Sequence, residues 1–249
     1  MARAIDRRRF IGAAAAVGGV LALAPRVFAQ AYAVPEDHRR ILEVARREVA
    51  RAGSRIWRAD IAGIADFGLP SSLPRLHFAN LESGTVRSFL VTHGRGSDPE
   101  NDGLLKWFSN VPGSYATSRG AYVSYEWYTG MHGISLRLGG LDPDNSNVLA
   151  RAIVMHSAPY ARLETLARFG KLGRSDGCLA MAPEDFDQAL LYLSGGRLIF
   201  ADRLGIYPAS ALPPPGGVPG ALGGPGTIPN DPASAPPVAT GTVSAGPAG

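Results

Sequence analysis

The sequence predicts a mainly β domain of the α+β class, a β-sandwich or mixed sheet with an N-terminal helix and a disordered C-terminal tail. Three observations predict it. Short apolar segments with a two-residue period follow one another from about residue 75 to residue 201, one earlier segment has helical spacing, and residues 208–249 contain almost no large apolar residue. The 249 residues, 45% of them apolar, suffice for one domain with tails.

The first 29 residues have the pattern of an export signal. Residues 7–11 read Arg-Arg-Arg-Phe-Ile, which fits a twin-arginine motif, and an apolar run follows over residues 12–24. This run is shorter than the roughly 20 residues that span a bilayer. We expect cleavage after Ala29, with Ala33 as the alternative, a periplasmic mature protein, and no stable membrane anchor after cleavage.

Residues 34–70 are predicted to form an N-terminal helix and a connector. The helix should run from about residue 35 to Ala52, capped by Asp37 and ended by Gly53, with arginines on its solvent side. Its buried face would carry Ile41, Val44, Ala45, Val49 and Ala52.

Residues 71–207 are predicted to form the main domain. A β-hairpin is expected over residues 75–80 and 86–93, because Glu82-Ser83-Gly84 separates two alternating segments. One short helix is expected over residues 183–193. Further strands are expected over residues 121–128, 134–138, 148–156 and 198–201. Residues 208–249, rich in Pro, Gly, Ala, Ser and Thr, are predicted to be a disordered spacer, since they cannot bury enough apolar surface to offset their ordering entropy.

The composition argues against two classes of function. The net charge of +4 and pI near 9.5 come without Cys/His zinc-finger spacing or basic segments interleaved with aromatics, so no nucleic-acid partner is expected. His93, His132 and His156 could suggest a zinc site, but they lack the tight spacing of metal ligands. We expect no metal and no organic cofactor.

The most informative residue is Cys178, the one cysteine in the sequence. In an exported protein it cannot form an intramolecular disulfide, so it is buried and inert, intermolecular, or reactive. The apolar segment ending at His156 offers an imidazole that could hold the proton of a thiolate nucleophile. Gly177 permits a tight turn, and the backbone N–H groups of Gly177 and Cys178 could face a developing oxyanion.

A set of motifs around these residues resembles a known family. Residues 170–178 read Gly-Lys-Leu-Gly-Arg-Ser-Asp-Gly-Cys, and His156 follows an apolar segment. The chain is similar in this to the L,D-transpeptidases of the YkuD type, in the branch with a Gly-Arg-Ser-x-Gly-Cys loop. The likeness covers about residues 75–203. It includes His93-Gly94-x-Gly96-Ser97, Phe108-Ser109-Asn110, Ser118-x-Gly120-x-Tyr122, Tyr128-x-Gly130-x-His132-Gly133-x-Ser135-Leu136 and Gly140-Leu141-Asp142.

The resemblance implies a role for each matching residue. Cys178 would be the nucleophile and His156 the proton donor and acceptor. The backbone carbonyl of Ser157 would orient the ring, and the N–H of Gly177 would bind the oxyanion. The implied substrate contacts are Arg174, Ser175, Asp176 and His132, the last equally well explained as a turn residue.

The implied activity is cysteine-dependent acyl transfer on peptidoglycan stem peptides, in which an amine resolves a thioester. Two alternatives stay open: an L,D-carboxypeptidase or endopeptidase with the same Cys/His site, and a non-catalytic wall-binding module. The chain departs from the common signature at Asp176, where a histidine is usual, and at Leu179-Ala180, where Arg and a hydrophobic residue are frequent. A carboxylate beside a thiol tends to raise the thiol pKa. It could also contact substrate or order the loop.

Overall fold

The computed structural model describes residues 36–206. The predicted signal at residues 1–29 and the predicted tail at residues 208–249 lie outside this range. Within it, no helix combines the length and the apolar character needed to cross a membrane.

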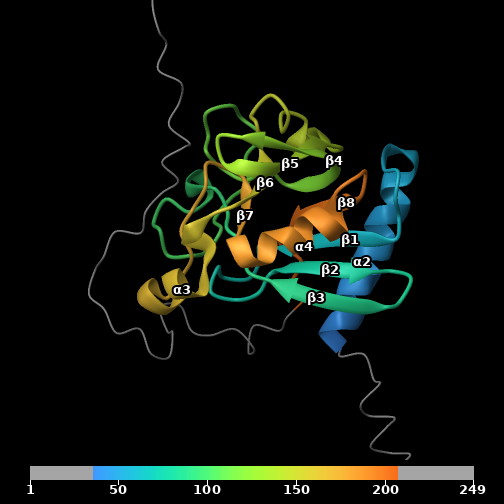
Figure 1. The fold of residues 1–249 in the computed structure, drawn as a ribbon, viewed down its shortest axis with the longest axis horizontal. Helices are drawn as coiled ribbons and strands as arrows, with labels where there is room; N and C mark the ends of the chain where they lie inside the picture. The colour runs from blue at the N-terminus through green and yellow to red at the C-terminus, as the bar shows by residue number, and fades with distance from the viewer. Residues whose placement is uncertain (1–35, 207–249) are drawn as a thin grey trace, which may run out of the picture. The chain divides into compact units, whose positions relative to one another are not determined.

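The described part of the chain is organised around one mixed sheet of eight strands (Figure 1). The strand order is β3-β2-β1-β8-β4-β5-β6-β7, in which β1/β8 and β6/β7 are parallel and the other neighbours antiparallel. This confirms the predicted mainly β, mixed-sheet class. The strands are β1 (Ile61–Asp66), β2 (Leu76–Asn80), β3 (Thr85–Phe89), β4 (Gly120–Gly130), β5 (Gly133–Gly140), β6 (Val154–Ser157), β7 (Leu179–Met181) and β8 (Leu198–Asp202).

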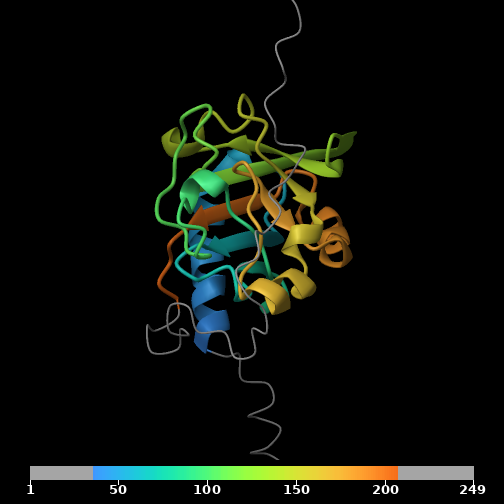
Figure 2. The same cartoon turned by 90° about the vertical axis from the view of Figure 1, so that its left-hand side faces the viewer.

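Two helices cover opposite faces of the sheet. Helix α2 (Glu36–Ala52) packs Ile41 and Ala45 into a cluster with Ile64 of β1. Helix α4 (Pro183–Leu193) packs Phe186 and Leu193 into the cluster on the other face, and Figures 1 and 2 show the sheet between the two helices. The remaining helical segments are α3 (Leu163–Phe169) and the 3-10 turns η1 (Gly53–Arg55), η2 (Arg95–Ser97), η3 (Pro143–Asn145) and η4 (Pro159–Ala161). The predicted helix over 183–193 is confirmed, and α2 confirms the predicted N-terminal helix over its described residues.

The sheet explains why some segments were predicted well and others were not. The hairpin β2–β3 is confirmed, although β3 ends at Phe89 rather than residue 93. The connector prediction was wrong over residues 61–66, because these residues form the interior strand β1 between β2 and β8. All six β1 residues are buried, so the segment lacks the polar alternation of a half-exposed strand.

The strand predicted over residues 148–156 begins only at Val154. The residues before it form turns, in which the N–H of Arg151 donates to Asn147 O at 2.8 Å and that of Ala152 to Leu149 O at 3.1 Å. Ala152 has φ +52°, a left-handed conformation that ends any extended path. This turn carries two residues of the site described next.

Candidate active site

Two neighbouring parallel strands bring His156 and Cys178 to one face of the sheet. In the register between β6 and β7, His156 lies opposite Ala180. Cys178 directly precedes β7, two residues before Ala180. Side chains two residues apart along an extended chain point the same way, and paired residues of parallel strands share a face. The register, continued by one residue to Cys178, therefore directs the Cys178 thiol and the His156 imidazole to the same face.

The ring of His156 is oriented from two sides. Its Nδ1 lies 3.0 Å from the carbonyl O of Ser157. Because a carbonyl can only accept, this contact favours the tautomer with hydrogen on Nδ1 and leaves Nε2 as the basic nitrogen. The His132 ring stacks on the His156 ring with centroids 4.1 Å apart. His132, at the β4–β5 turn, is therefore part of the site rather than only of its hairpin.

Cys178 is buried, with 8% of its surface exposed. Its Sγ donates to the carbonyl O of Ala152 at 3.8 Å. That carbonyl belongs to the left-handed residue at the end of the turn before β6. A non-glycine residue holds this conformation only where its surroundings impose it. The backbone at Ala152 is thus fitted against the thiol.

The loop that ends at Cys178 is organised by Ser175, which is 1% exposed. Its N–H donates to His93 O at 3.0 Å, its carbonyl accepts from the N–H of Arg95 at 2.7 Å, and its hydroxyl donates to Cys178 O at 2.7 Å. These bonds use both backbone polar groups and the side chain of Ser175. The contacts give Ser175 a structural role in the loop, and the substrate contact predicted for it stays a prediction.

Gly177 occupies a place that a larger residue would not fit. Its φ of +118° favours glycine, and a Cβ there would lie 2.8 Å from Ala116 O. The N–H of Gly177 donates to Ser175 Oγ at 3.2 Å. The oxyanion role predicted for Gly177 therefore requires that this hydrogen bond be shared or exchanged when substrate binds.

The departure from the common signature, Asp176, has a charged partner across the loop. Its Oδ1 accepts from Arg95 Nε at 2.5 Å, and the Arg95 guanidinium lies 3.8 Å from the centroid of the Tyr115 ring. The hydrogen bond that Arg95 donates to Asp176 raises the pKa of Arg95. The pair offsets the negative charge beside the nucleophile and orders the loop, which favours the loop-ordering interpretation of Asp176.

Arg174 also reaches back to the segment before the loop. Its Nη1 donates to the carbonyl O of Asp98, and the side chain is half-buried. Burial lowers the pKa of Arg174. A substrate contact through the other guanidinium nitrogens stays a prediction.

A buried network of Arg75, His93 and Asp98 adjoins the loop. Arg75 is fully buried, and its Nη2 lies 2.7 Å from His93 Nδ1. Because a guanidinium only donates, Nδ1 accepts and His93 carries its proton on Nε2, which lies 3.3 Å from Asp98 Oδ2. Burial, followed by the charge of Arg75, lowers the pKa of His93 to about 4. The His93 ring is therefore a neutral bridge between two charges at neutral pH.

The same network holds Asp98 ionised. Burial alone would raise the pKa of Asp98, but hydrogen bonds from His93 and from the N–H groups of Asp102 and Gly103 outweigh it and lower the pKa. Ser175 donates to His93 O and Arg174 to Asp98 O, so this network supports the nucleophile loop.

Arg151, which the sequence analysis did not select, bridges the other side of the loop. Its Nη2 lies 3.4 Å from the position that a Cβ would take at Gly177. The guanidinium group donates four hydrogen bonds of 2.6–3.1 Å, to the carbonyls of Ser109 and Ala116 and the hydroxyls of Ser114 and Ser118. A charged residue inside an otherwise apolar run from Val148 to Val154 was the signal in the sequence that could have selected it.

Arg95 was also not predicted as a site residue, because it occupies the variable position of the His93-Gly94-x-Gly96-Ser97 motif. The three histidines do not converge, because His93 lies in the buried network while His132 and His156 stack on each other. Among residues 36–206, no group of three or more His, Cys, Asp or Glu side chains could hold a metal ion.

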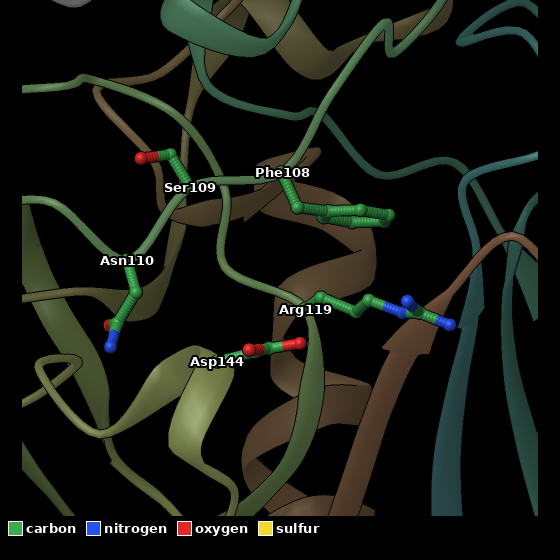
Figure 3. Close-up of a pocket in the computed structure, with 5 residues that line it drawn as sticks. All are labelled: Phe108, Ser109, Asn110, Arg119 and Asp144. Carbon is green, nitrogen blue, oxygen red and sulfur yellow. The ribbon is translucent and has the colours of Figure 1, made fainter.

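A pocket of about 340 Å³ lies beside the segment that Arg151 holds, and Figure 3 shows its lining. It is lined by Phe108, Ser109, Asn110, Arg119 and Asp144. Arg119 pairs with Asp202 at 2.8 Å, and the Asn110 amide donates to Pro143 O at 3.0 Å. These contacts join the 108–119 segment to η3 and β8, and the Ser109 carbonyl is shared with Arg151.

Comparison with known proteins places most of the described chain in one family. Residues 38–201 match the family model described as the L,D-transpeptidase catalytic domain. No curated protein matches the sequence.

Several solved structures are similar to the chain. An L,D-transpeptidase from Mycobacterium smegmatis is 14% identical, with 57% of this chain and 58% of that chain covered and a TM-score of 0.36. An L,D-transpeptidase from Mycobacterium tuberculosis H37Rv is 19% identical, with 57% of each covered and a TM-score of 0.32. The helical cell shape determining protein Pgp2 from Campylobacter jejuni is 13% identical, with 64% of this chain and 55% of that chain covered and a TM-score of 0.37. The chain thus spans less than two thirds of each of these proteins.

Proposed function

The chain belongs to the L,D-transpeptidase catalytic domain family, whose model spans residues 38–201, and from that membership we propose that it cross-links peptidoglycan stem peptides through a thioester on Cys178. Members of this family act on peptidoglycan stem peptides. The observation that carries the proposal is the β6–β7 register, in which His156 pairs with Ala180, two residues after Cys178. Neither residue requires a metal or an organic cofactor for acyl transfer.

The chemistry follows from the two side chains. The Cys178 thiolate attacks the carbonyl carbon on the L-centre side of an L,D peptide bond, and the C–S bond forms as the C–N bond breaks. His156, protonated on Nε2, gives its proton to the leaving D-amino acid. An amine of a second stem then attacks the thioester, His156 takes the proton of the amine, and the thiolate is released.

The orientation of the His156 ring supports this assignment. With Nδ1–H directed to Ser157 O, proton transfer is confined to Nε2, as a general acid and base requires. We assign the oxyanion to the backbone N–H groups of Gly177 and Cys178, each such donor contributing about 3 kcal/mol in well-studied cases. Arg174, Asp176 and His132 are proposed to line the path of the stem peptide.

We further propose that residues 1–29 direct twin-arginine export to the periplasm and are removed there. Residues 71–207 would then act as the catalytic domain, together with helix α2 and strand β1 from residues 34–70, and residues 208–249 would act as a spacer.

Product analysis tests the reaction against its closest alternative. Residues 34–249 are mixed with purified muropeptides, and products are compared with those of Cys178→Ala by mass. Cross-linked dimers that the variant does not form support transpeptidation. Shortened monomers alone would assign the chain to the L,D-carboxypeptidases or endopeptidases, and no product with any muropeptide would contradict the proposal and favour a wall-binding module.

A further inference from the structure

Arg151 carries a charge to which the steps of the proposed acyl transfer assign no role. Its side chain is half-buried, yet all four hydrogen-bond acceptors are neutral carbonyl or hydroxyl oxygens. Burial of a charge is costly unless an opposite charge or a set of hydrogen bonds compensates it. A neutral donor could satisfy hydroxyls and carbonyls at lower cost, so the positive charge calls for a reason of its own.

Arg151 interacts electrostatically with two titratable side chains, Tyr122 and Cys178. Burial lowers the pKa of Arg151, and electrostatic interactions with Tyr122 and Cys178 oppose this lowering. Tyr122 is fully buried, its hydroxyl donates to Ser118 O at 2.5 Å, and burial raises its pKa. Tyr122 therefore stays neutral near pH 7, which leaves Cys178 as the group that can become negative beside the guanidinium.

The backbone next to Arg151 meets the same sulfur. Ala152 O accepts from Cys178 Sγ while Ala152 holds φ +52°. The four hydrogen bonds of the neighbouring Arg151 side chain fix this turn in place. One residue thus anchors both the 109–118 segment behind Gly177 and the turn that contacts the thiol.

We propose that Arg151 is a positioning residue for Cys178, whose guanidinium holds the 109–118 segment against Gly177 and whose positive charge favours the thiolate over the thiol. The inference rests on the proposed function in taking Cys178 as the nucleophile. The other charged or titratable groups near Cys178 include Tyr122, which stays neutral, Asp176, which Arg95 neutralises, and His156, the proposed proton partner.

The test is the pH profile of alkylation of Cys178 by iodoacetamide, followed by intact mass, because the chain has one cysteine. Wild type is compared with Arg151→Met, Arg151→Lys and Arg119→Met. The last removes an equal charge directly after the segment that Arg151 holds, but from a side chain paired with Asp202. We expect Arg151→Met to raise the midpoint of the profile by about one pH unit, as loss of a nearby opposite charge does. Arg119→Met and Arg151→Lys should leave the midpoint within about 0.3 units of wild type.

Lysine keeps the charge but cannot donate the four bonds in their fixed geometry. Arg151→Lys should therefore lower the rate of acyl transfer several-fold without moving the midpoint, which separates position from charge. An unchanged midpoint in a folded Arg151→Met variant would overturn the proposal. If that variant does not fold, a midpoint for Arg151→Lys raised to the value of about 8.5 of an ordinary cysteine would overturn it. The alkylation profile needs no muropeptide, so it is decided independently of whether the chain proves to be a transpeptidase.

Discussion

Two segments flank the nucleophile loop at residues 174–178, and they are held to it by different means. The segment at residues 92–98 is joined mainly through the backbone: Ser175 exchanges hydrogen bonds with His93 and Arg95, and the N–H of Thr92 donates to Ala180 O at 2.9 Å. The segment at residues 109–118 is held by the Arg151 side chain, which lies outside the loop and whose neighbour Ala152 accepts from Cys178 Sγ.

The difference indicates that one segment stabilises the loop and the other sets the reactivity of Cys178. Backbone pairing over a buried ionic network leaves little freedom to move, so the 92–98 side should govern whether the loop forms at all. The Arg151 guanidinium contributes a positive charge and four hydrogen bonds to neutral acceptors, and both can be changed without disturbing the sheet. We therefore expect changes on the first side to appear mainly in stability and changes on the second mainly in the reactivity of Cys178.

The largest effect in stability is expected at Gly94. A Cβ there would lie 2.2 Å from Tyr115 O and 2.8 Å from both N and Cα of Gly177, so Gly94→Ala must push apart the loop and both flanking segments. We expect a loss of about 3 kcal/mol in the free energy of unfolding, measured with urea.

Gly84→Ala is the matched control, since Gly84 has φ +67° in the β2–β3 turn and nothing within 4 Å of its added Cβ. That variant bears backbone strain alone, about 1 kcal/mol. Equal losses for the two variants would show that the 92–98 segment is not tightly joined to the loop.

The second effect is a dependence of stability on pH that arises from the 92–98 side. Burial lowers the pKa of His93 to about 4, below the value near 6.5 of an unfolded chain. The unfolded state therefore binds the proton more readily, so this contribution is complete above about pH 6.5 and is lost as pH falls toward 4. We expect His93 to account for about 2 kcal/mol of the stability lost between pH 7 and pH 5.

His93→Gln tests this assignment, because glutamine can accept from Arg75 and donate to Asp98 without titrating. His77, whose pKa burial also lowers to about 4, remains in this variant and should retain its own share of the loss. A variant that loses as much stability as wild type between the two pH values would contradict the role given to His93.

The smallest effect is expected at Asp176. The Arg95–Asp176 pair is partly exposed, with 38% and 16% of the two side chains accessible, and such pairs contribute below about 1 kcal/mol. Asp176→Asn should change the stability little and, because it leaves the Arg95 guanidinium unpaired, should lower the alkylation midpoint of Cys178. Arg95→Met leaves the carboxylate unpaired and should raise that midpoint. A larger shift of the midpoint in Asp176→Asn than in Arg95→Met would mean that Asp176 acts on the thiol directly.

Sequence periodicity predicted the elements that have one solvent face or a clear turn. Helix α2 and the β2–β3 hairpin were found because polar residues interrupt their apolar ones. Strand β1 was missed because both of its faces are buried, and β7 because three residues cannot display a period. The apolar run from Val148 to Ile153 was predicted as strand, but it forms a turn whose shape depends on Ala152. Val148 and Ile153 are apolar because they are buried in that turn.

The candidate site divides in the same way. Cys178, His156 and Gly177 stand in short motifs that a sequence displays directly. Arg151 acts on residues 33 to 42 positions before it, and Arg95 pairs with a residue 81 positions away. Contacts of that kind arise only when the sheet brings the segments together, so residue type and spacing did not reveal them.

The central claim, a thioester on Cys178, is tested most directly by trapping the acyl-enzyme. Residues 34–249 are mixed with a purified stem-peptide donor without an acceptor, quenched in acid, and digested for peptide mass mapping. We predict an adduct of the donor acyl group on the peptide that contains Cys178, released by hydroxylamine and absent from Cys178→Ala. An adduct on another residue, or turnover of the donor by the Cys178→Ala variant, would contradict the account.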